Sequence, residues 1–509
     1  MPEGTVGAAS RRAGRGARAD RGARAGRGWR VLTGVLALVG VVAVGFAWIV
    51  SSPTGASPDD DFHLTSIWCP YPIAAHCTVV GESAPGYPLV EVPQKVAAGA
   101  LTYAYQPEVS AAAQDTLSDT LLVLNDRVNT GAYPGLFYTV MHWFAGPDVD
   151  RSVLVMRGVN FGIAIVLYGA ALLLLAGSQR RLFSYTLVAT ALPVSVYFTA
   201  STNPTAWAIT GVVAVWIGLH GYLTIPGWRR AGFAALAVAG TVLAAGGRTD
   251  AALYCAIVAV AVTVLHLPTV VRRARLGILP AVVAVAGLVV LLTASDTGGY
   301  IERADVGDRS GWQVFWSNMA HLPDTLITFW SCDLGWFDVP TPTITSVLLL
   351  VVTLVVIGAG LVRARADWHK VAALVILGGA IYGLPVAMMQ FRLEYFAEWG
   401  IQVRYLVPLI VVLAGVALTG SLRDDPPPLP RWATLATLAA LATAHGFLLH
   451  TLIRRYVTGT DVTGFNLDAG AEWWAVTAVS PMGTWALGTT GAVLLCTAVA
   501  LQTTPRPLP

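Results

Sequence analysis

Three consecutive aspartates and a nearby histidine form the stretch of this chain whose side chains are best suited to chemistry. Residues 57–63 read Ser-Pro-Asp-Asp-Asp-Phe-His and follow shortly after an apolar run that ends near Val50. If that run crosses a bilayer, Asp59, Asp60 and His63 lie just outside the hydrocarbon, where a charge needs no burial. A carboxylate there can act as a general base, and an imidazole can orient it or donate a proton. The competing interpretation is a solvated turn in which the aspartates cap the next element.

The composition of the chain indicates an integral membrane protein. Of its 509 residues, 55% are hydrophobic and only 12% are charged, whereas soluble proteins carry about 25% charged residues. Spanning structures in lipid must satisfy their own backbone hydrogen bonds, which long apolar runs achieve as helices. We therefore expect an all-α polytopic membrane protein.

The apolar runs that are long enough to cross a bilayer number about twelve. In chain order they are 31–50, 152–176, 182–200, 206–225, 231–245, 251–270, 276–293, 344–362, 371–389, 405–422, 432–452 and 482–501. The run 231–245 is short and rich in alanine, which makes it the weakest of them. Together they predict a single polytopic domain over residues 31–505.

The distribution of arginine predicts the orientation of this domain. With the N-terminus inside, the connections 179–181, 228–230, 272–275 and 363–370 are cytoplasmic and basic, as the positive-inside rule requires. A fifth, 423–431, is rich in proline and mixed in charge. We expect a plasma-membrane protein with both termini in the cytoplasm.

The N-terminal segment 1–30 contains eight arginines in a low-complexity Arg/Gly/Ala sequence and should be disordered. Because it adjoins an apolar run, it suits anionic membrane lipids better than nucleic acid.

Two long external segments remain, a first loop over 51–151 and a second over 294–343. In the first we expect short helices on the membrane surface, with helix-compatible material in 109–127. Cys69 and Cys77 lie close together in this loop, outside the cytoplasm, where a disulfide persists. The second loop looks like an amphipathic surface element followed by a tight turn, and it contains Trp312, Trp316, Trp330 and Trp336.

Charged and polar residues at the external ends of spans are further candidates for a site, because an unpaired charge in hydrocarbon costs several kcal/mol. Arg248 and Asp250 share a short link, where they either pair only with each other or present a guanidinium to a phosphate. Asn203 opens an external turn that can also be a simple helix cap.

Arginines at other span ends complete this group. Arg404 opens a span, where it can anchor the helix in the interface or bind an anion. Arg454 and Arg455 end a span on the outside, against the positive-inside trend, and external arginines suit a lipid-linked phosphate. The chain has no GxxxxGK[ST], GxSxG or HExxH motif and no His/Cys spacing for zinc, so nucleotide hydrolysis is unsupported.

Five short segments carry a resemblance to a known family. They are 58–63 (Pro-Asp-Asp-Asp-Phe-His), 201–209 (Ser-Thr-Asn-Pro-Thr-Ala-Trp-Ala-Ile), 247–250 (Gly-Arg-Thr-Asp), 335–340 (Gly-Trp-Phe-Asp-Val-Pro) and 403–408 (Val-Arg-Tyr-Leu-Val-Pro). They resemble, in the same order, the patterns Pro-Asp-Glu-x-x-His, Asn-Pro-Ser-Ser-Trp, Ser-Arg-x-Asp, Gly-Trp-Leu-Asp-Thr-Pro and Gly-Arg-Tyr-Leu-Leu-Pro of the domain-of-unknown-function 2142 family of bacterial membrane proteins. Departures include Asp60 in place of Glu and Gly247 in place of Ser. The family is similar in layout to the GT-C glycosyltransferases.

This resemblance implies an enzyme that passes a sugar from a polyprenyl-phosphate donor in the membrane to an external glycan or protein acceptor, in envelope or surface-glycan assembly. It implies catalytic roles for Asp59, Asp60 and His63, and the two aspartates would hold a divalent cation if one is used. The physical case agrees, because glycosyl transfer needs a carboxylate for the acceptor hydroxyl and cations for the departing phosphate. The candidate substrate-binding residues are Arg248, Asp250, Asn203, Asp338, Arg404, Arg454 and Arg455. Asp61 is left out, since the pattern leaves its position variable.

Two alternatives stay open. A transporter or flippase of lipid-linked glycans predicts ionisable residues near the bilayer midplane and inverted repeats. A noncatalytic membrane assembly partner is the other. The ionisable groups gather at external span ends and no repeat is evident in the sequence, which favours the enzyme.

Overall fold

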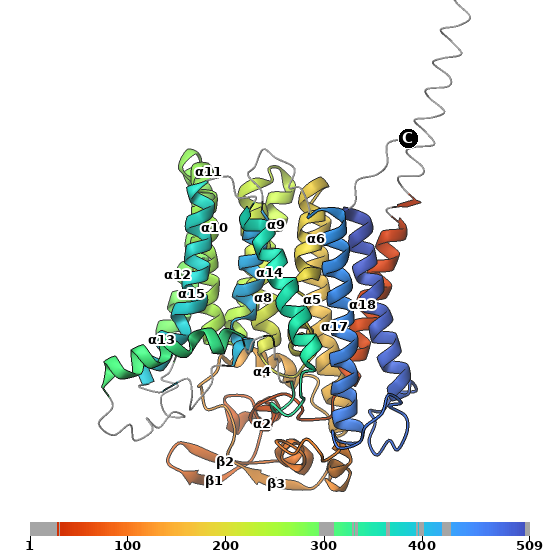
Figure 1. The fold of residues 1–509 in the computed structure, drawn as a ribbon. Helices are drawn as coiled ribbons and strands as arrows, with labels where there is room; N and C mark the ends of the chain where they lie inside the picture. The colour runs from red at the N-terminus through yellow and green to blue at the C-terminus, as the bar shows by residue number, and fades with distance from the viewer. Residues whose placement is uncertain are drawn as a thin grey trace, which may run out of the picture.

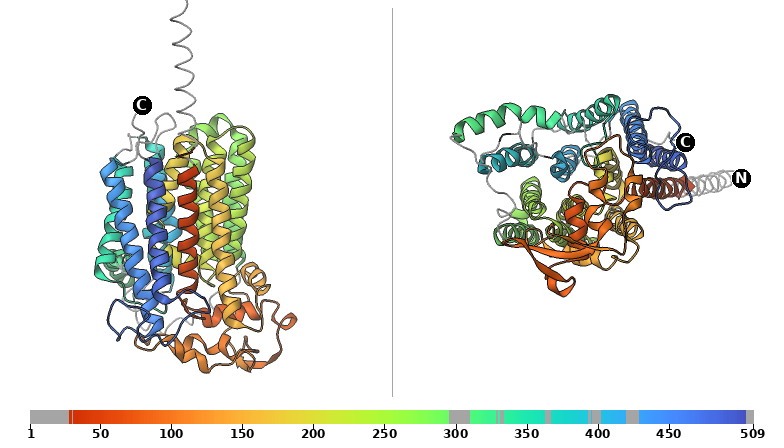
Figure 2. Two further views of the ribbon diagram at one scale, coloured as in Figure 1. Left: turned by 90° about the vertical axis from the view of Figure 1, so that its right-hand side faces the viewer. Right: turned by 90° about the horizontal axis from the view of Figure 1, so that it is seen from below.

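A bundle of long helices carries a smaller body of loops and strands at one end (Figure 1). The computed structural model describes residues 28–29, 31–294, 310–327, 330, 334–362, 367–392, 395, 402–419 and 429–503. We call the end of the bundle that carries residues 51–148 the loop side. The two side views in Figures 1 and 2 show this body beneath the helix ends.

Within the described residues, nine helices are long and apolar enough to cross a membrane. They are Val31–Val50, α5 (Val149–Leu174), α8 (Thr205–Thr224), α9 (Trp228–Gly247), Ala274–Thr293, which contains α12 (Ile278–Thr293), α14 (Thr343–Val362), α15 (Trp368–Arg392), α17 (Arg431–Val457) and α18 (Pro481–Thr503). A tenth arises if α6 (Gly177–Ala189) and α7 (Pro193–Thr199), which are bent by 90° at their junction, count as one span. The chain is thus a mainly helical polytopic membrane protein.

The expected number of about twelve spans is not confirmed. The two remaining runs form α10 (Thr249–Leu265) and α16 (Val407–Leu418), of 17 and 12 residues. At about 1.5 Å per residue these helices measure about 26 and 18 Å, less than the about 30 Å of a hydrocarbon core. The weak run 231–245 does better than expected, because it lies within the 20 residues of α9.

The central helix of the bundle is α8, in which 94% of the residues of its apolar stretch are buried. Small residues allow it to approach α9 closely. A Cβ at Gly211 would lie 2.5 Å from the carbonyl oxygen of Gly240, and one at Gly218 would lie 2.6 Å from the amide nitrogen of Ala237. Contacts this short exclude any side chain, so glycine at these positions permits the van der Waals packing that joins helices in membranes.

The body on the loop side is a mixture of strands and short helices. Its antiparallel sheet has the order β1-β2-β3, formed by Val79–Ala84, Tyr87–Pro93 and Leu122–Asn125. The helices are α2 (Asp60–Trp68), α3 (Gln94–Ala98) and α4 (Gly135–His142). The short helices expected from the sequence are present, but the sheet was not expected, and 109–127 contains only a 3₁₀ turn, Ala111–Thr116, before β3. Exposure alternates from residue to residue along 122–125, as expected for a strand with one covered face.

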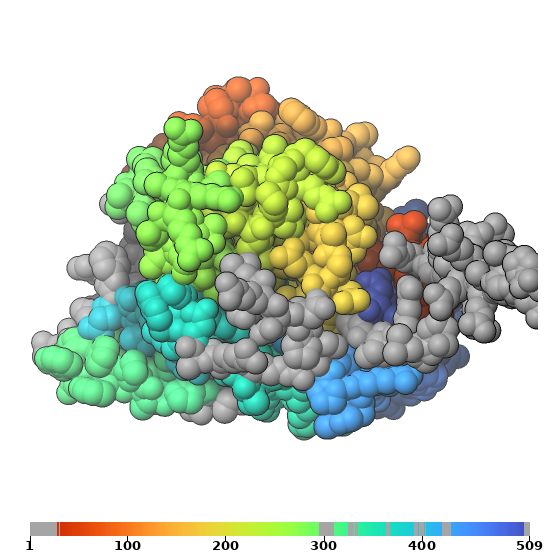
Figure 3. All heavy atoms as spheres, turned by 90° about the horizontal axis from the view of Figure 1, so that it is seen from above, coloured from red at the N-terminus to blue at the C-terminus, as the bar shows by residue number. Residues whose placement is uncertain are grey.

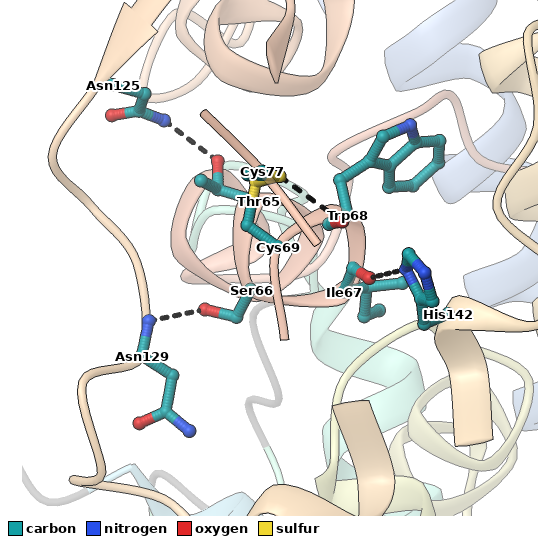
Figure 4. Close-up of a disulfide and its surroundings, with 9 residues drawn as sticks. All are labelled: Thr65, Ser66, Ile67, Trp68, Cys69, Cys77, Asn125, Asn129 and His142. Carbon is teal, nitrogen blue, oxygen red and sulfur yellow. Dashed lines mark hydrogen bonds between the residues drawn. A yellow bond between two sulfur atoms is a disulfide. The ribbon is translucent and has the colours of Figure 1, made fainter. Parts of the chain in front are cut away.

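Sheet and helices together hold α2 in place. Val90 and Val92 of β2 are buried against Phe62, Leu64 and Ile67 of α2. Figure 4 shows further contacts that hold the same helix. Cys69 and Cys77 form a disulfide at its C-terminal end, Asn125 donates to the Thr65 hydroxyl at 2.8 Å, and the Asn129 amide donates to the Ser66 hydroxyl at 2.9 Å. The aspartates at the start of α2 therefore sit on a fixed support.

Elsewhere, α11 (Leu267–Arg272) lies at the opposite end of the bundle, and α13 (Gly311–Ile327) runs sideways at the loop-side ends of the spans (Figure 1).

Candidate functional site

Asp59 is the residue immediately before α2, and its backbone is unusual. Its φ is 63°, in the left-handed region that L-residues rarely adopt and that Asp and Asn tolerate best. Its carbonyl oxygen accepts hydrogen bonds from the amides of Phe62 and His63, which begins the helix. The Asp59 side chain is 42% exposed, whereas Asp60 and Asp61 are buried. Of the three carboxylates, only that of Asp59 is thus open to a ligand.

Two arginines and a tyrosine lie beside Asp59. Arg404 donates from Nη2 to Asp59 Oδ2 at 3.2 Å and to the Tyr405 hydroxyl at 3.2 Å. Arg248 donates to both oxygens of Asp250, each at 2.9 Å. The guanidinium carbons of Arg248 and Arg404 lie 4.4 and 5.1 Å from the centre of the Tyr405 ring, so this ring connects them. We call Asp59, Arg248, Asp250, Arg404 and Tyr405 the Asp59 cluster.

Arg404 has hydrogen-bonding capacity that its neighbours do not use. Its side chain is only 4% exposed, and its guanidinium carbon lies 5.0 Å from the centre of the Phe198 ring. Among the described residues, Nε and Nη1 find no acceptor. A buried donor without a partner costs about 1–3 kcal/mol, and more when it is charged. The cluster therefore suits an anion that would accept these two hydrogen bonds.

His63 lies near the cluster but does not contact its carboxylates. Its Nδ1 is 2.9 Å from the Tyr138 hydroxyl, and its ring packs against that of Tyr133, which in turn lies 5.7 Å from the guanidinium of Arg248. Burial lowers the pKa of His63 well below its usual value, and the positive charges of Arg248 and Arg404 lower it further. The imidazole is therefore neutral near pH 7. The expected contact with a carboxylate is replaced by one with Tyr138.

Asp60 faces the interior of the protein. Its Oδ2 accepts from the Ser57 amide at 3.0 Å and from the Thr202 hydroxyl at 3.1 Å, while Oδ1 has no partner among the described residues. Burial raises the pKa of Asp60 to about 7, against the opposing effect of Arg157. From the sequence, either Asp59 or Asp60 could be the catalytic carboxylate. The structure separates them, because Asp60 is fully enclosed and ties the segment before α2 to Thr202.

Asn203, like Thr202, forms a hydrogen bond to the segment before α2. Its side-chain amide donates to the carbonyl oxygen of Pro58 at 3.0 Å, and its Oδ1 accepts from the Thr205 amide at 3.0 Å. These contacts hold the turn before α8 against the segment that precedes α2, and substrate binding by Asn203 stays a prediction.

Arg127 is a residue that the sequence reasoning missed. It forms an ion pair with Asp61 and lies 4.0 Å from Asp59, on a half-exposed side chain. Asp61, which the family pattern leaves variable, thus positions a third cation beside Asp59. One signal was available, because Arg127 is the only arginine between residues 51 and 150.

Three other predicted site residues do not join the cluster through any of their contacts. Arg455 forms a buried ion pair with Asp338 at 2.6 Å and donates to the carbonyl oxygens of Tyr103 and Val109. Arg454 donates to the carbonyl oxygens of Gly464 and Asn466. These contacts are structural, and substrate binding by Arg454, Arg455 and Asp338 stays a prediction. Through these carbonyl oxygens the two arginines hold the loops around α17, although the Nε of each has no partner among the described residues.

The residues present do not fit a divalent cation. Among the parts of the chain that the structure describes, no three His, Cys, Asp or Glu side chains converge on one point. Asp60 points inward, and Asp59 has Arg404 and Arg127 beside it, which would repel a metal ion. The proposed pair of Asp59 and Asp60 as ligands is not supported by this geometry.

Comparison with known proteins supplies the family. No curated protein and no solved structure matches the chain. Residues 42–413 match the family described as predicted membrane protein (DUF2142), and this range holds Asp59, Arg248 and Arg404. Since the match covers well over half of the 509 residues, the chain belongs to this family of membrane proteins.

Proposed function

We propose that the protein is a membrane glycosyltransferase that takes a sugar from a polyprenyl-phosphate donor at the extracytoplasmic face and passes it to an external glycan or protein acceptor. The observation that carries the proposal is the contact of Asp59 with Arg404. A half-exposed carboxylate lies 3.2 Å from a buried guanidinium, two of whose donors have no acceptor among the described residues. A base and an anion site thus lie side by side.

In a glycosyl transfer, Asp59 suits the acceptor hydroxyl and Arg404 suits the departing phosphate. The bond between the anomeric carbon and the phosphate oxygen breaks as the acceptor oxygen bonds to that carbon. The Asp59 carboxylate receives the proton of the acceptor hydroxyl. Arg404 stabilises the negative charge on the departing phosphate with its Nε and Nη1 donors, and Arg248, held by Asp250, adds a second positive charge.

The placement of charge along α9 supports an extracytoplasmic site. Arg229 and Arg230 lie in the first turn of this 20-residue helix, and Arg248 follows its last residue. The basic pair and the Asp59 cluster are therefore at opposite ends of one span. Basic connections favour the cytoplasm, which leaves the cluster on the outer side.

One observation favours a transporter or flippase as a second candidate. The 90° break between α6 and α7 is the kind of discontinuous helix found at the substrate sites of transporters. At this break, His445, from the middle of α17, hydrogen-bonds the carbonyl oxygen of Ala191 at 2.7 Å. An ionisable residue inside a span is a functional candidate by default.

The test compares envelope glycans of a deletion strain that carries the wild-type gene, Asp59→Asn or Asp115→Asn. Asn keeps the size of the side chain and tolerates the left-handed backbone of Asp59. Asp115 is an exposed carboxylate of the same loop and serves as the matched control. We expect the wild type and Asp115→Asn to restore the missing glycan and Asp59→Asn to leave it absent at equal protein level in the membrane.

The lipid-linked sugar separates the two candidates. Loss of a transferase leaves the lipid-linked sugar in the outer leaflet, whereas loss of a flippase leaves it in the cytoplasmic leaflet. Full restoration of the glycan by Asp59→Asn would refute the catalytic role of this carboxylate.

A further inference from the structure

An aromatic stripe lies on the exposed face of α13. Trp312 and Trp316 are 70% and 63% exposed, their rings stack with centroids 6.4 Å apart, and Met319 follows one turn later. Residues at this spacing share one face of a helix. Such an exposed concentration of large apolar side chains marks an interaction site in a folded protein.

The opposite face of α13 already has its partner. Val314, Asn318 and Leu322 are buried, and Leu322 packs with Val386 and Met389 of α15. The side chain of Gln390 donates to the carbonyl oxygen of Gly311 at 3.0 Å, which fixes the start of the helix. The stripe of Trp312, Trp316 and Met319 therefore faces away from the protein.

The contact with Gln390 also fixes the depth of α13. Gln390 is the last residue of the 23-residue apolar span Trp368–Gln390. At about 1.5 Å per residue this span measures about 35 Å, so Gln390 lies near the boundary of a hydrocarbon core of about 30 Å. Figure 1 shows α13 running sideways at this level, and in Figures 2 (right) and 3 it forms an outer edge of the molecule.

The chemistry of the stripe decides what it binds. Trp312, Trp316 and Met319 carry no charge, so the stripe offers no charge to a protein partner. Tryptophan is enriched where membranes meet water, because its ring is apolar and its N–H finds polar headgroups. We propose that α13 is an interfacial anchor whose tryptophan stripe inserts into the leaflet on the loop side. This inference does not depend on glycosyl transfer.

The anchor has a consequence for the Asp59 cluster. Helix α15 packs against both α13 and α16, and α16 begins three residues after Arg404. An α13 held at the headgroup level therefore fixes the height of the Arg404 guanidinium relative to the lipid phosphates.

Depth measurement by spin labelling tests this proposal on the full chain in phosphatidylcholine vesicles. A nitroxide is attached to Trp316→Cys in a background that carries Cys332→Ser, the one cysteine outside the described residues. The other cysteines do not compete for the label, because Cys255 and Cys496 are buried and Cys69 pairs with Cys77. Val285→Cys on the exposed face of α12 and Glu82→Cys on β1 supply the hydrocarbon and water references.

We expect the label at position 316 to lie about 5–10 Å below the lipid phosphates, with an oxygen accessibility between those of the two references. Two results would overturn the proposal. Accessibility to a water-soluble relaxant equal to that at position 82 would place the stripe in water. Protection from both oxygen and the water-soluble relaxant would mean that protein covers it, as in a contact with a second copy of the chain.

Discussion

The buried carboxyl of Asp60 should make the stability of the protein depend on pH, and Asp60→Asn should remove much of that dependence. Asn can accept the hydrogen bonds from the Ser57 amide and the Thr202 hydroxyl that Asp60 Oδ2 accepts now. It resembles the protonated carboxyl in size and charge. The substitution therefore isolates the ionisation of this one group.

The magnitude follows from the pKa. Burial raises it from the ordinary value of 3.8 to about 7. Because the folded protein holds this proton more tightly than the unfolded chain, the contribution of Asp60 to the free energy of unfolding falls as pH rises from about 4 to about 8 and is then level. At about 1.4 kcal/mol per pH unit, the total is about 4 kcal/mol. About 2 kcal/mol of it is lost between pH 5 and pH 7, and about 3 kcal/mol between pH 5 and pH 8.

Equilibrium unfolding in mixed detergent micelles, titrated with SDS from pH 5 to pH 8, measures this loss. Between pH 5 and pH 8, wild type and Asp115→Asn should lose about 3 kcal/mol of stability relative to Asp60→Asn. His63, whose pKa burial lowers, contributes with the opposite sign but equally in all three proteins. Asp61, whose pKa burial also raises, contributes with the same sign and is present in all three proteins. Parallel curves for wild type and Asp60→Asn would refute the assignment of a raised pKa to Asp60.

Three further substitutions test the packing around the site by the same unfolding measurement. Asp59→Ala should lower the free energy of unfolding by about 1–2 kcal/mol more than Asp59→Gly, because only glycine adopts φ 63° freely. Equal stabilities of the two variants would argue against the left-handed backbone. Arg455→Met should lower the free energy of unfolding by about 3–5 kcal/mol, because it leaves the buried carboxylate of Asp338 without an ion-pair partner. Adding Asp338→Leu should recover part of this loss. Simple additivity of the two effects would speak against their pairing. Gly415→Ala should cost about 1–3 kcal/mol, since a Cβ there would meet the Trp216 ring at 2.0 Å; an unchanged stability would contradict this close approach of α16 to α8.

The membrane character of the chain could be predicted from the sequence because hydrophobicity is a property of each segment by itself. Every predicted run contains a helix, although α10 and α16 are shorter than predicted. Helix ends depend on capping and on neighbouring helices as well as on apolar length, so the number of spans was less certain than the fold class. The family could also be recognised from the sequence, because its short motifs occur in the same order along the chain.

The loop-side body was harder to predict. Its three strands are short, and β1 and β3 are edge strands that alternate weakly in hydrophobicity. β1 and β2 form a local hairpin, but the pairing of β2 with β3 joins segments that are distant in sequence, as in the pairing of Val92 with Val123. Local pattern carries little information about such contacts.

The sequence alone determined that acidic and basic residues gather at span ends, because each lies next to an apolar run. It could not decide which of them meet. Asp59 and Asp60 are neighbours of the same type, yet the left-handed backbone leaves one half-exposed beside Arg404 and the other enclosed beside Thr202. Arg404 and Arg455 look equivalent at their span ends, yet Arg455 pairs with the buried Asp338, whereas Arg404 lies beside an accessible carboxylate with two donors that have no acceptor among the described residues. Tertiary structure decided these differences, because burial and pairing arise from contacts between segments hundreds of residues apart, and such contacts fix the charge and availability of each group.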